Sequence, residues 1–142
     1  MSERALLFTS AGLTLALPAR LGRETFVLQR LLPLPGGQPA LIGLTEVRGR
    51  AVPLLDLPGL LGVLPAEGTH SVPETGSLAL LLDVNGEALA FPVEQVIGVA
   101  TLEDLPRPTG LLSAPFNAGT ATLHALNVDA LAATIRLRLP VP

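Results

Sequence analysis

The chain has no cysteine, lysine, tryptophan or tyrosine, and its only aromatic residues are four phenylalanines among 142 residues. Without cysteine, disulfide bonds, cysteine-ligated zinc and thiol catalysis are excluded. With so few aromatic side chains, a stacking platform for single-stranded nucleic acid is nearly absent. The nine basic residues are all arginines, are outnumbered by twelve acidic residues and form no basic run, so we expect no nucleic-acid partner.

Long apolar runs are missing as well. The uninterrupted apolar stretches are a few residues long, whereas about 20 residues are needed to span a bilayer. Glu3 places an acid near the N-terminus, where a signal peptide has positive charge only. We therefore expect a cytoplasmic protein without direct membrane insertion, and the absence of cysteine suits a reducing compartment.

Glycine and proline are abundant, with 14 residues of each, and hydrophobic residues make up 49% of the chain. This composition disfavours long helices. Short apolar segments between turn residues instead predict a single all-β domain over residues 1–142, built as a sandwich or as two small barrels. The predicted strands are Ala5–Thr9, Leu13–Leu17, Thr25–Leu31, Leu41–Val47, Ala51–Leu55, Leu78–Val84, Ala88–Pro92, Gln95–Ala100 and Thr120–Leu126.

A hairpin is predicted over Leu78–Pro92, where Asn85 and Gly86 separate two apolar runs. Both central residues of a type I′ turn require positive φ, which asparagine and glycine tolerate best. Because Leu78–Leu82 is apolar at every position, both faces of this strand are expected to be covered. The strand is therefore predicted to lie in the interior of a sheet.

Near the C-terminus, Val128–Ile135 predicts a short helix, with Asn127 or Asp129 available as its N-cap. Two stretches rich in proline and glycine, Pro33–Pro39 and Val63–Gly76, are predicted loops. Neither is long or polar enough to link separate domains.

Side chains suited to catalysis or metal binding are few. His70 lies in a predicted loop and His124 on a predicted strand, so they are interpreted as solvated and structural, respectively. Asp56 and Asp83 each end an apolar strand, but neither is followed by the Thr-Gly or Ser-Gly of an aspartic protease. No GxGxxG or Walker motif is present. We therefore predict that the protein is not an enzyme and has no catalytic residue, cofactor or metal site.

An arginine-glycine turn joins two predicted strands. Gly49 permits positive φ directly after Arg48, so the guanidinium is expected to project from a tight turn at a strand end. A fixed, exposed arginine beside apolar surface suits partner binding. The alternative is a surface hairpin with a solvated arginine.

The strand after this turn contains Pro53 and ends at Asp56. Because proline lacks an N–H, Pro53 predicts an edge or bulged position rather than a central one. Asp56 is placed to cap a single helical turn over Leu57–Leu61, and Gly62 follows as a natural C-terminal residue.

This block resembles the signature of the CheW-like domains, the coupling proteins of bacterial chemotaxis. The resemblance runs from about Leu13 to about Leu131, and the Arg-Gly to Asp-Leu block is its most specific part. The residues that match the signature are Val47, Arg48, Gly49, Val52, Pro53, Leu54, Leu55, Asp56, Leu57, Leu61 and Gly62, with support from Leu15–Pro18, Arg23–Val27, Leu41–Leu44, Asn85–Glu87 and Phe91–Val96.

The resemblance implies a fold of two intertwined five-stranded SH3-like barrels with a hydrophobic core between them. It also implies a non-enzymatic adaptor that couples the cytoplasmic tip of methyl-accepting chemoreceptors to the regulatory domain of a CheA-type histidine kinase. The alternative is a small-molecule- or peptide-binding β-barrel outside signalling. An adaptor should expose its arginine beside a groove between the barrels, whereas a ligand carrier should enclose one cavity with convergent polar groups.

By the same resemblance, Arg48 faces the receptor and Glu24 pairs with it. The implied receptor-binding residues are Arg48, Glu24, Val47 and Gly49, and the implied structural motif is Pro53, Asp56, Leu57 and Gly62. The kinase is expected to contact apolar barrel ends.

The chain also departs from the family's pattern. Glu46 stands where a neutral residue is common, and Pro58 stands where a charged residue is common. Between Ala100 and Thr120, a stretch that includes Pro106–Pro108 has few strand-forming residues, so one strand of a barrel is expected to be weak or missing there.

Overall fold

The computed structural model describes residues 2–33, 41–61 and 76–138, and the side chains of these residues except 33 and 134–138. Two sheets dominate it, one of five strands in the order β10-β11-β2-β1-β9 and one of six in the order β3-β7-β8-β6-β5-β4. The strands are β1 (Glu3–Ser10), β2 (Leu13–Pro18), β3 (Gly22–Val27), β4 (Leu31–Pro33), β5 (Leu41–Val47), β6 (Arg50–Leu55), β7 (Leu78–Val84), β8 (Glu87–Pro92), β9 (Gln95–Leu102), β10 (Phe116–Ala118) and β11 (Ala121–Ala125).

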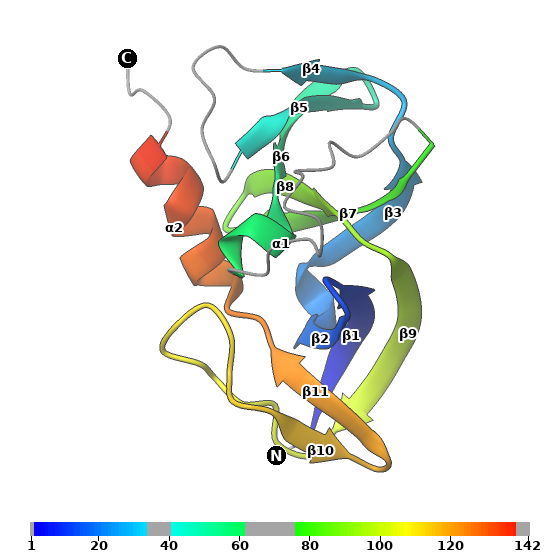
Figure 1. Ribbon diagram of the computed structural model, residues 1–142, viewed down its shortest axis with the longest axis vertical. Helices are drawn as coiled ribbons and strands as arrows, with labels where there is room; N and C mark the ends of the chain where they lie inside the picture. Colours follow the sequence, from blue (N-terminus) through cyan, green and yellow to red (C-terminus); the bar gives the residue numbers. More distant parts are fainter. Residues whose placement is uncertain (1, 34–40, 62–75, 139–142) are drawn as a thin grey trace.

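The chain passes between the sheets twice. It builds β1 and β2 of the five-stranded sheet, continues through β3–β8 of the six-stranded sheet, and returns with β9–β11. Figure 1 shows the five-stranded sheet, hereafter the first lobe, below the six-stranded sheet, hereafter the second lobe. The all-β fold of two intertwined subdomains is confirmed. The implied five strands per subdomain hold for the first lobe only, because β4 pairs with β5 and adds a sixth strand to the second.

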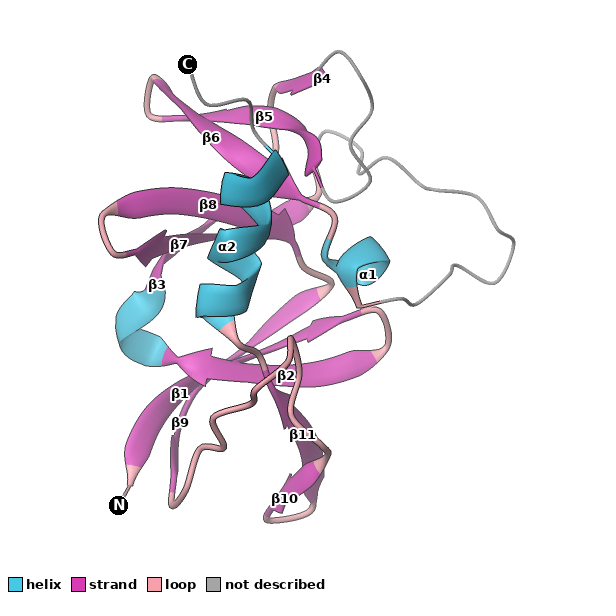
Figure 2. Ribbon diagram, turned by 90° about the vertical axis from the view of Figure 1, so that its left-hand side faces the viewer, coloured by secondary structure: helices cyan, strands magenta, loops and turns pink. Residues whose placement is uncertain are grey.

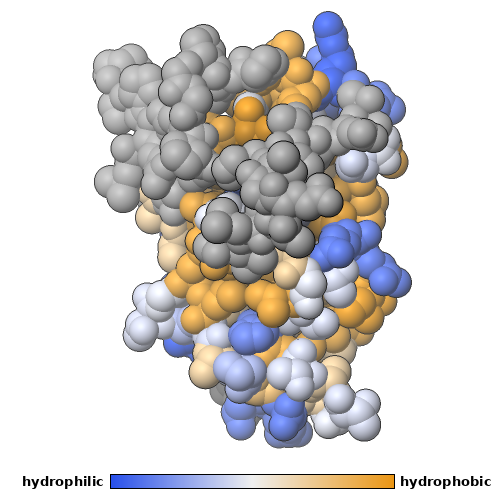
Figure 3. Space-filling model, viewed as in Figure 1, coloured by the Kyte–Doolittle hydropathy of each residue, from blue (hydrophilic) through white to orange (hydrophobic). Residues whose placement is uncertain are grey.

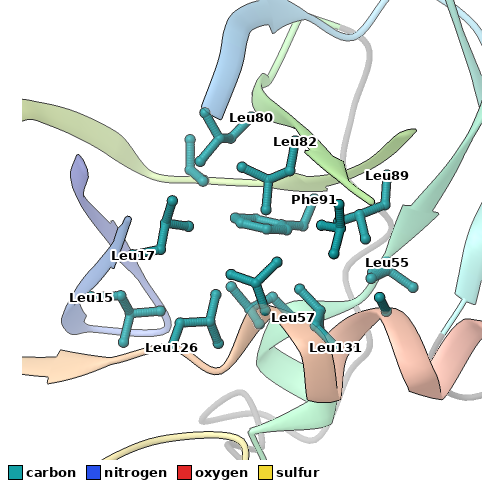
Figure 4. Packing of buried hydrophobic residues seen from close by; sticks show 14 of the residues in the cluster. Leu15, Leu17, Leu55, Leu57, Leu80, Leu82, Leu89, Phe91, Leu126 and Leu131 are labelled. Atoms are coloured by element: carbon teal, nitrogen blue, oxygen red, sulfur yellow. The ribbon is translucent and has the colours of Figure 1, made fainter. Parts of the chain in front are cut away.

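A large hydrophobic cluster, hereafter the central core, lies between the lobes. The first lobe contributes Phe8, whose ring centroid lies 5.4 Å from that of Phe91 in the second lobe. Figure 4 shows how side chains from both lobes and both helices converge in this core. Its fully buried members with under 2% relative exposure are Phe8, Leu15, Leu17, Leu55, Leu57, Leu80, Leu82, Leu89, Phe91 and Leu131.

Strand β7 is covered on both faces, as its uniformly apolar sequence predicted. Leu80 and Leu82 point into the central core, whereas Ala79 and Leu81 belong to a second cluster inside the second lobe. The strand lies between β3 and β8, so its predicted interior position is confirmed. The hairpin that follows it turns at Asn85 and Gly86, whose φ angles of 53° and 84° fit the predicted turn.

The short helix α1 (Leu57–Leu60) begins as the sequence predicted. The carboxylate of Asp56 accepts a hydrogen bond from the Gly59 N–H at 3.2 Å, so Asp56 is the N-cap. Pro58 lies in the first turn, where its missing N–H leaves no intrahelical bond unmade. Gly62 lies outside the described residues.

The second helix, α2 (Val128–Arg138), runs from the end of β11 along the second lobe (Figure 2). Of the two candidate caps it uses Asn127, whose side-chain oxygen accepts from the Ala130 N–H at 3.1 Å. Leu131 anchors the helix in the central core with no exposed surface. No helix among the described residues, including the 3-10 turn Ala19–Leu21, is long and apolar enough to cross a membrane.

The predicted single strand Thr25–Leu31 is wrong. The chain leaves β3 after Val27 and starts β4 at Leu31. Between them, Leu28 is 2% exposed, its N–H donates to the Ser77 carbonyl at 2.9 Å, and its own carbonyl accepts from Gly76 at 2.7 Å. These two hydrogen bonds fix Leu28, which separates β3 from β4, beside the residues that precede β7.

The predicted edge position of Pro53 is also wrong, because β6 lies inside the sheet between β8 and β5. Alternate residues of an antiparallel strand direct their N–H away from the partner. On the other side, β6 meets β8 at the single pair Leu54–Ala90. Pro53 therefore fits an interior strand without leaving a ladder hydrogen bond unmade. The irregularity of this ladder lies in β5, between Leu41 and Gly43.

The segment between Ala100 and Thr120 does contain a strand. β9 extends to Leu102, and β10 (Phe116–Ala118) pairs with β11. The proline-rich stretch lies in the loop between them. The strand that the sequence put in doubt is therefore present, but β10 has only three residues. Residues 34–40 and 62–75 lie outside the described residues. They include most of both predicted loops, and His70 with them.

Candidate binding site

The β5–β6 hairpin closes in a two-residue turn at Arg48 and Gly49. Their φ angles are 53° and 79°, and Val47 pairs with Arg50 across the turn, which is the geometry of a type I′ hairpin. The sequence predicted positive φ at Gly49 but not at Arg48. A left-handed conformation costs a residue other than glycine about 1 kcal/mol or more, and asparagine tolerates it better than arginine. The turn therefore holds its arginine at some cost to backbone stability.

Glu24 of β3 reaches this turn. Its Oε2 lies 2.6 Å from Nη2 of Arg48, and the expected pairing of these two residues is confirmed. The side chain of Arg48 is 80% exposed and that of Glu24 is 27% exposed. An exposed ion pair of this kind contributes about 0–1 kcal/mol. Its main effect is to orient the guanidinium, and one carboxylate leaves most of the five N–H donors of that group available.

A bulge in β3 sets up the acidic partner. The register with β7 shifts between Gly22 and Glu24, which leaves Arg23 as the extra residue. Arg23 donates to the carboxylate of Asp83 at 2.7 Å. That hydrogen bond is the main cause that lowers the pKa of Asp83, with a further contribution from the Gly86 N–H. Two consecutive β3 residues are thus each fixed in an ion pair.

A third ion pair lies on the neighbouring strands. Arg30 and Glu46 approach to 3.6 Å with side chains 73% and 50% exposed, respectively. The hydroxyl of Thr45, which is buried, donates to the Arg30 carbonyl at 3.0 Å. Glu46 is the residue that departs from the family's usual neutral side chain, and here it neutralises a nearby arginine.

Apolar side chains also reach the surface of the second lobe. Val27 on β3 and Leu32 on β4 are 52% and 55% exposed. Val47 differs from them, because its side chain is only 9% exposed and packs with Val52 and Leu54 beneath the turn. Figure 3 shows apolar and charged patches interspersed on one face of the molecule. Of the four predicted receptor-binding residues, three therefore offer surface at the turn, and Val47 supports it from below.

Two hollows of the surface lie away from the Arg48 turn. A hollow of about 650 Å³ opens at the end of the first lobe, between β9 and the β10–β11 hairpin, and is lined by apolar residues such as Leu102, Phe116 and Leu123. A hollow of about 300 Å³ lies beside the start of α2. Neither is lined by Glu24 or Arg48. The candidate site is thus a projecting turn and not the wall of a described pocket.

No three histidine or carboxylate side chains among the described residues converge as a metal site requires. Nδ1 of His124 lies 3.2 Å from the Ser113 carbonyl, which ties the β11 strand to the loop before β10. Oδ1 of Asp83 accepts from the Gly86 N–H at 2.9 Å, so Asp83 stabilises the hairpin turn, as a residue flanking a hairpin is expected to do.

The predicted structural residues support the site from inside the lobe. Leu57 has no exposed surface and joins α1 to the central core. Asp56 caps that helix, and Pro53 lies opposite Leu44 on β5. Together they fix the end of β6, the strand that begins at the Arg48 turn. Two ion pairs, Arg23–Asp83 and Arg30–Glu46, were not predicted, because no local sequence signal links residues on different strands.

The chain matches the family model described as CheW-like domain over residues 4–134. Among solved structures, it is similar to the scaffolding protein TtCheW from Thermoanaerobacter tengcongensis, with a TM-score of 0.72, 16% sequence identity and 89% of each chain covered. A search of curated protein sequences found no match. At this identity the structural match shows a shared fold, whereas the family model spans most of the sequence. The chain belongs to the CheW-like domain family.

Proposed function

We propose that this protein is a non-enzymatic chemosensory adaptor, which couples methyl-accepting chemoreceptors to a CheA-type histidine kinase. Membership of the CheW-like family supports a scaffolding role in chemotaxis. The single observation behind the proposed receptor coupling is Arg48. Its side chain is 80% exposed, yet its guanidinium is fixed by Glu24 at 2.6 Å. A preorganised and exposed arginine suits recognition of a partner, because little rotamer entropy remains to be lost on binding.

The proposed receptor site consists of Arg48, Glu24, Gly49 and the supporting Val47. Its partner is the cytoplasmic tip of a chemoreceptor, which places the complex in the cytoplasm. The donors of Arg48 that Glu24 does not occupy suit carboxylate or carbonyl oxygens on the receptor. Exposed Val27, on the same strand as Glu24, would add apolar contact beside them.

The kinase's regulatory domain is proposed to dock on an apolar lobe end. The open hollow of about 650 Å³ at the end of the first lobe supports this assignment, because Ala100, Phe116 and Ala118 line it, beside the acidic Glu103 and Asp104. It lies in a different sheet from the Arg48 turn, so both partners can bind at once. Such separate surfaces are what an adaptor requires.

Titration of a receptor cytoplasmic fragment into the purified chain tests the proposal. Arg48→Ala should weaken receptor binding roughly tenfold or more, since a central arginine is a typical hot spot. Arg107→Ala, an exposed arginine in the loop before β10, serves as the matched control and should bind like the wild type. Unchanged receptor affinity in Arg48→Ala, with the fold intact by circular dichroism, would exclude the proposed receptor site.

A ligand-binding barrel outside signalling remains the second candidate, and the open apolar hollow of the first lobe is the observation that favours it. If the chain bound neither the receptor fragment nor the kinase domain and instead retained a small apolar ligand through purification, mass spectrometry of the extracted ligand would establish that candidate.

A further inference from the structure

The sheet edges of this fold are protected unequally. Among the described strands, four lie at an edge: β10 and β9 in the first lobe, and β3 and β4 in the second. β10 and β4 have three residues each, and β4 ends in proline. β3 contains the charged residues Arg23 and Glu24. Short length, proline and charge are the devices by which proteins prevent strands from pairing with other molecules.

β9 has none of these three devices, although it carries a bulge at Ile97 and Gly98. Its eight residues, Gln95–Leu102, include no charge and no proline. Ile97 and Val99 are 53% and 50% exposed on its outer face. Figure 1 shows β9 along the outer side of the first lobe, with no strand beyond it. A long, uncharged edge with exposed apolar residues indicates that pairing with another strand is tolerated or used.

The sequence of β9 is nearly symmetric about Gly98. If a second β9 lies antiparallel with Gly98 opposite Gly98, Ile97 meets Val99 of the second copy and Gln95 meets Thr101 of the second copy. Every cross-strand pair then joins two apolar or two polar side chains, which is the pairing that stabilises antiparallel strands. The exposed face alternates through Gln95, Ile97, Val99 and Thr101, so these side chains share one face of the joined sheet.

The centre of this symmetry is also the point where β9 bends. The register with β1 shifts between Leu7 and Phe8, so that Ile97 is an extra residue opposite them, and Gly98 has a φ of 142°. An extra residue lengthens the outer strand and bends it, which brings its middle outward. Two such edges meet at their centres, and the absence of a side chain at Gly98 allows a close approach there.

We propose that two copies of this chain associate through antiparallel pairing of their β9 edges, centred on Gly98. The interface is small, because the bend limits the pairing to residues near the centre, and the dimer is correspondingly weak and concentration-dependent. Glu94 and Glu103 flank the strand beyond the paired residues. Salt that screens their mutual repulsion strengthens the association. This inference does not rest on the proposed function, although Ala100 and Thr101 of β9 also line the hollow proposed for the kinase domain.

Sedimentation equilibrium over a wide concentration range tests the dimer. The wild type should rise from the 14.7 kDa of one chain toward twice that mass. Val99→Lys should raise the dissociation constant at least tenfold, because it places a charge at the centre of the pairing. Val27→Lys is the matched control, since Val27 is 52% exposed on a strand of the other lobe, and it should associate like the wild type.

Because the chain has no cysteine, disulfide trapping tests the register directly. A mixture of Ile97→Cys and Val99→Cys chains should oxidise to the mixed dimer severalfold faster than either chain forms its own dimer. Val27→Cys mixed with Ile97→Cys should show no such preference. A monomer at every concentration, equal association of Val99→Lys and the wild type, or equal trapping with Val27→Cys would each overturn the proposal.

Discussion

Replacing Leu80 by aspartate should prevent the chain from folding. Leu80 is 1% exposed and lies on the β7 face that points into the central core (Figure 4). This core joins the two lobes, so its loss affects the whole molecule and not one sheet. The substitution removes the apolar contacts of the leucine and places a carboxylate where the neighbouring side chains are aliphatic or aromatic.

Two effects contribute to the destabilisation. Removing the buried leucine side chain, as in Leu80→Ala, costs about 2–5 kcal/mol. Burying an unpaired carboxylate adds several kcal/mol more. Domains have a free energy of unfolding of about 5–15 kcal/mol, so the sum is comparable with the whole stability. Leu80→Ala alone should lower the melting temperature by about 6–15 °C for a chain of this size.

Thermal unfolding followed by circular dichroism measures both effects. Leu80→Ala should remain folded with the lowered melting temperature, and Leu80→Asp should be insoluble or unfolded. Leu32→Asp is the control, because Leu32 is 55% exposed, and it should change the free energy of unfolding by no more than about 0.5 kcal/mol. A soluble Leu80→Asp variant that melts near the wild-type temperature would show that no shared core holds the lobes together.

The remaining predictions concern single interactions. Asp83 should titrate below its ordinary pKa. Because its pKa is lower in the folded state, the ionised carboxyl contributes its whole stabilisation above pH ~4 and loses it as the pH falls through the lowered pKa. NMR titration of Arg23→Ala should show the Asp83 carboxyl titrating at higher pH, and an unchanged titration would contradict the assigned cause. Asp56→Ala should cost about 0.5–2 kcal/mol in urea unfolding through loss of the α1 cap, whereas no change would mean that water replaces it. Gly49→Ala should destabilise by about 1 kcal/mol because its φ is 79°, and a neutral result would contradict the left-handed turn.

Features fixed by neighbouring residues were predictable from the sequence. The Asn85–Gly86 turn and the Asp56 cap depend on the conformational preferences of a few consecutive residues, and both are confirmed. The two covered faces of β7 followed from its uniformly apolar sequence. In each case the physical cause lies within the segment itself.

Features fixed by distant residues were not predictable in the same way. Pro53 was assigned to an edge because the sequence does not show that β6 meets β8 at one pair only. The break at Leu28 depends on hydrogen bonds to Ser77 and Gly76, about fifty residues away in the chain. A local apolar run therefore suggested one continuous strand where tertiary pairing makes two.

The candidate site depends both on neighbouring residues, which the sequence shows, and on contacts between distant residues, which it does not. The tight turn at Arg48 and Gly49 was expected from the residues, but the partnership of Arg48 with Glu24 was implied only by the family resemblance. The structure confirms that contact, and Glu24 follows a bulge in β3 that no sequence pattern predicted. The left-handed conformation of Arg48 itself was also missed, since arginine rarely occupies it.

The most direct test of the adaptor proposal is whether one chain can hold both partners at once. The wild type should bring a receptor cytoplasmic fragment and the kinase's regulatory domain into one ternary complex in sedimentation velocity, and Arg48→Ala should retain the kinase domain while losing the receptor fragment. A ternary complex of equal strength with Arg48→Ala, or no binding of either partner by the wild type, would contradict the account.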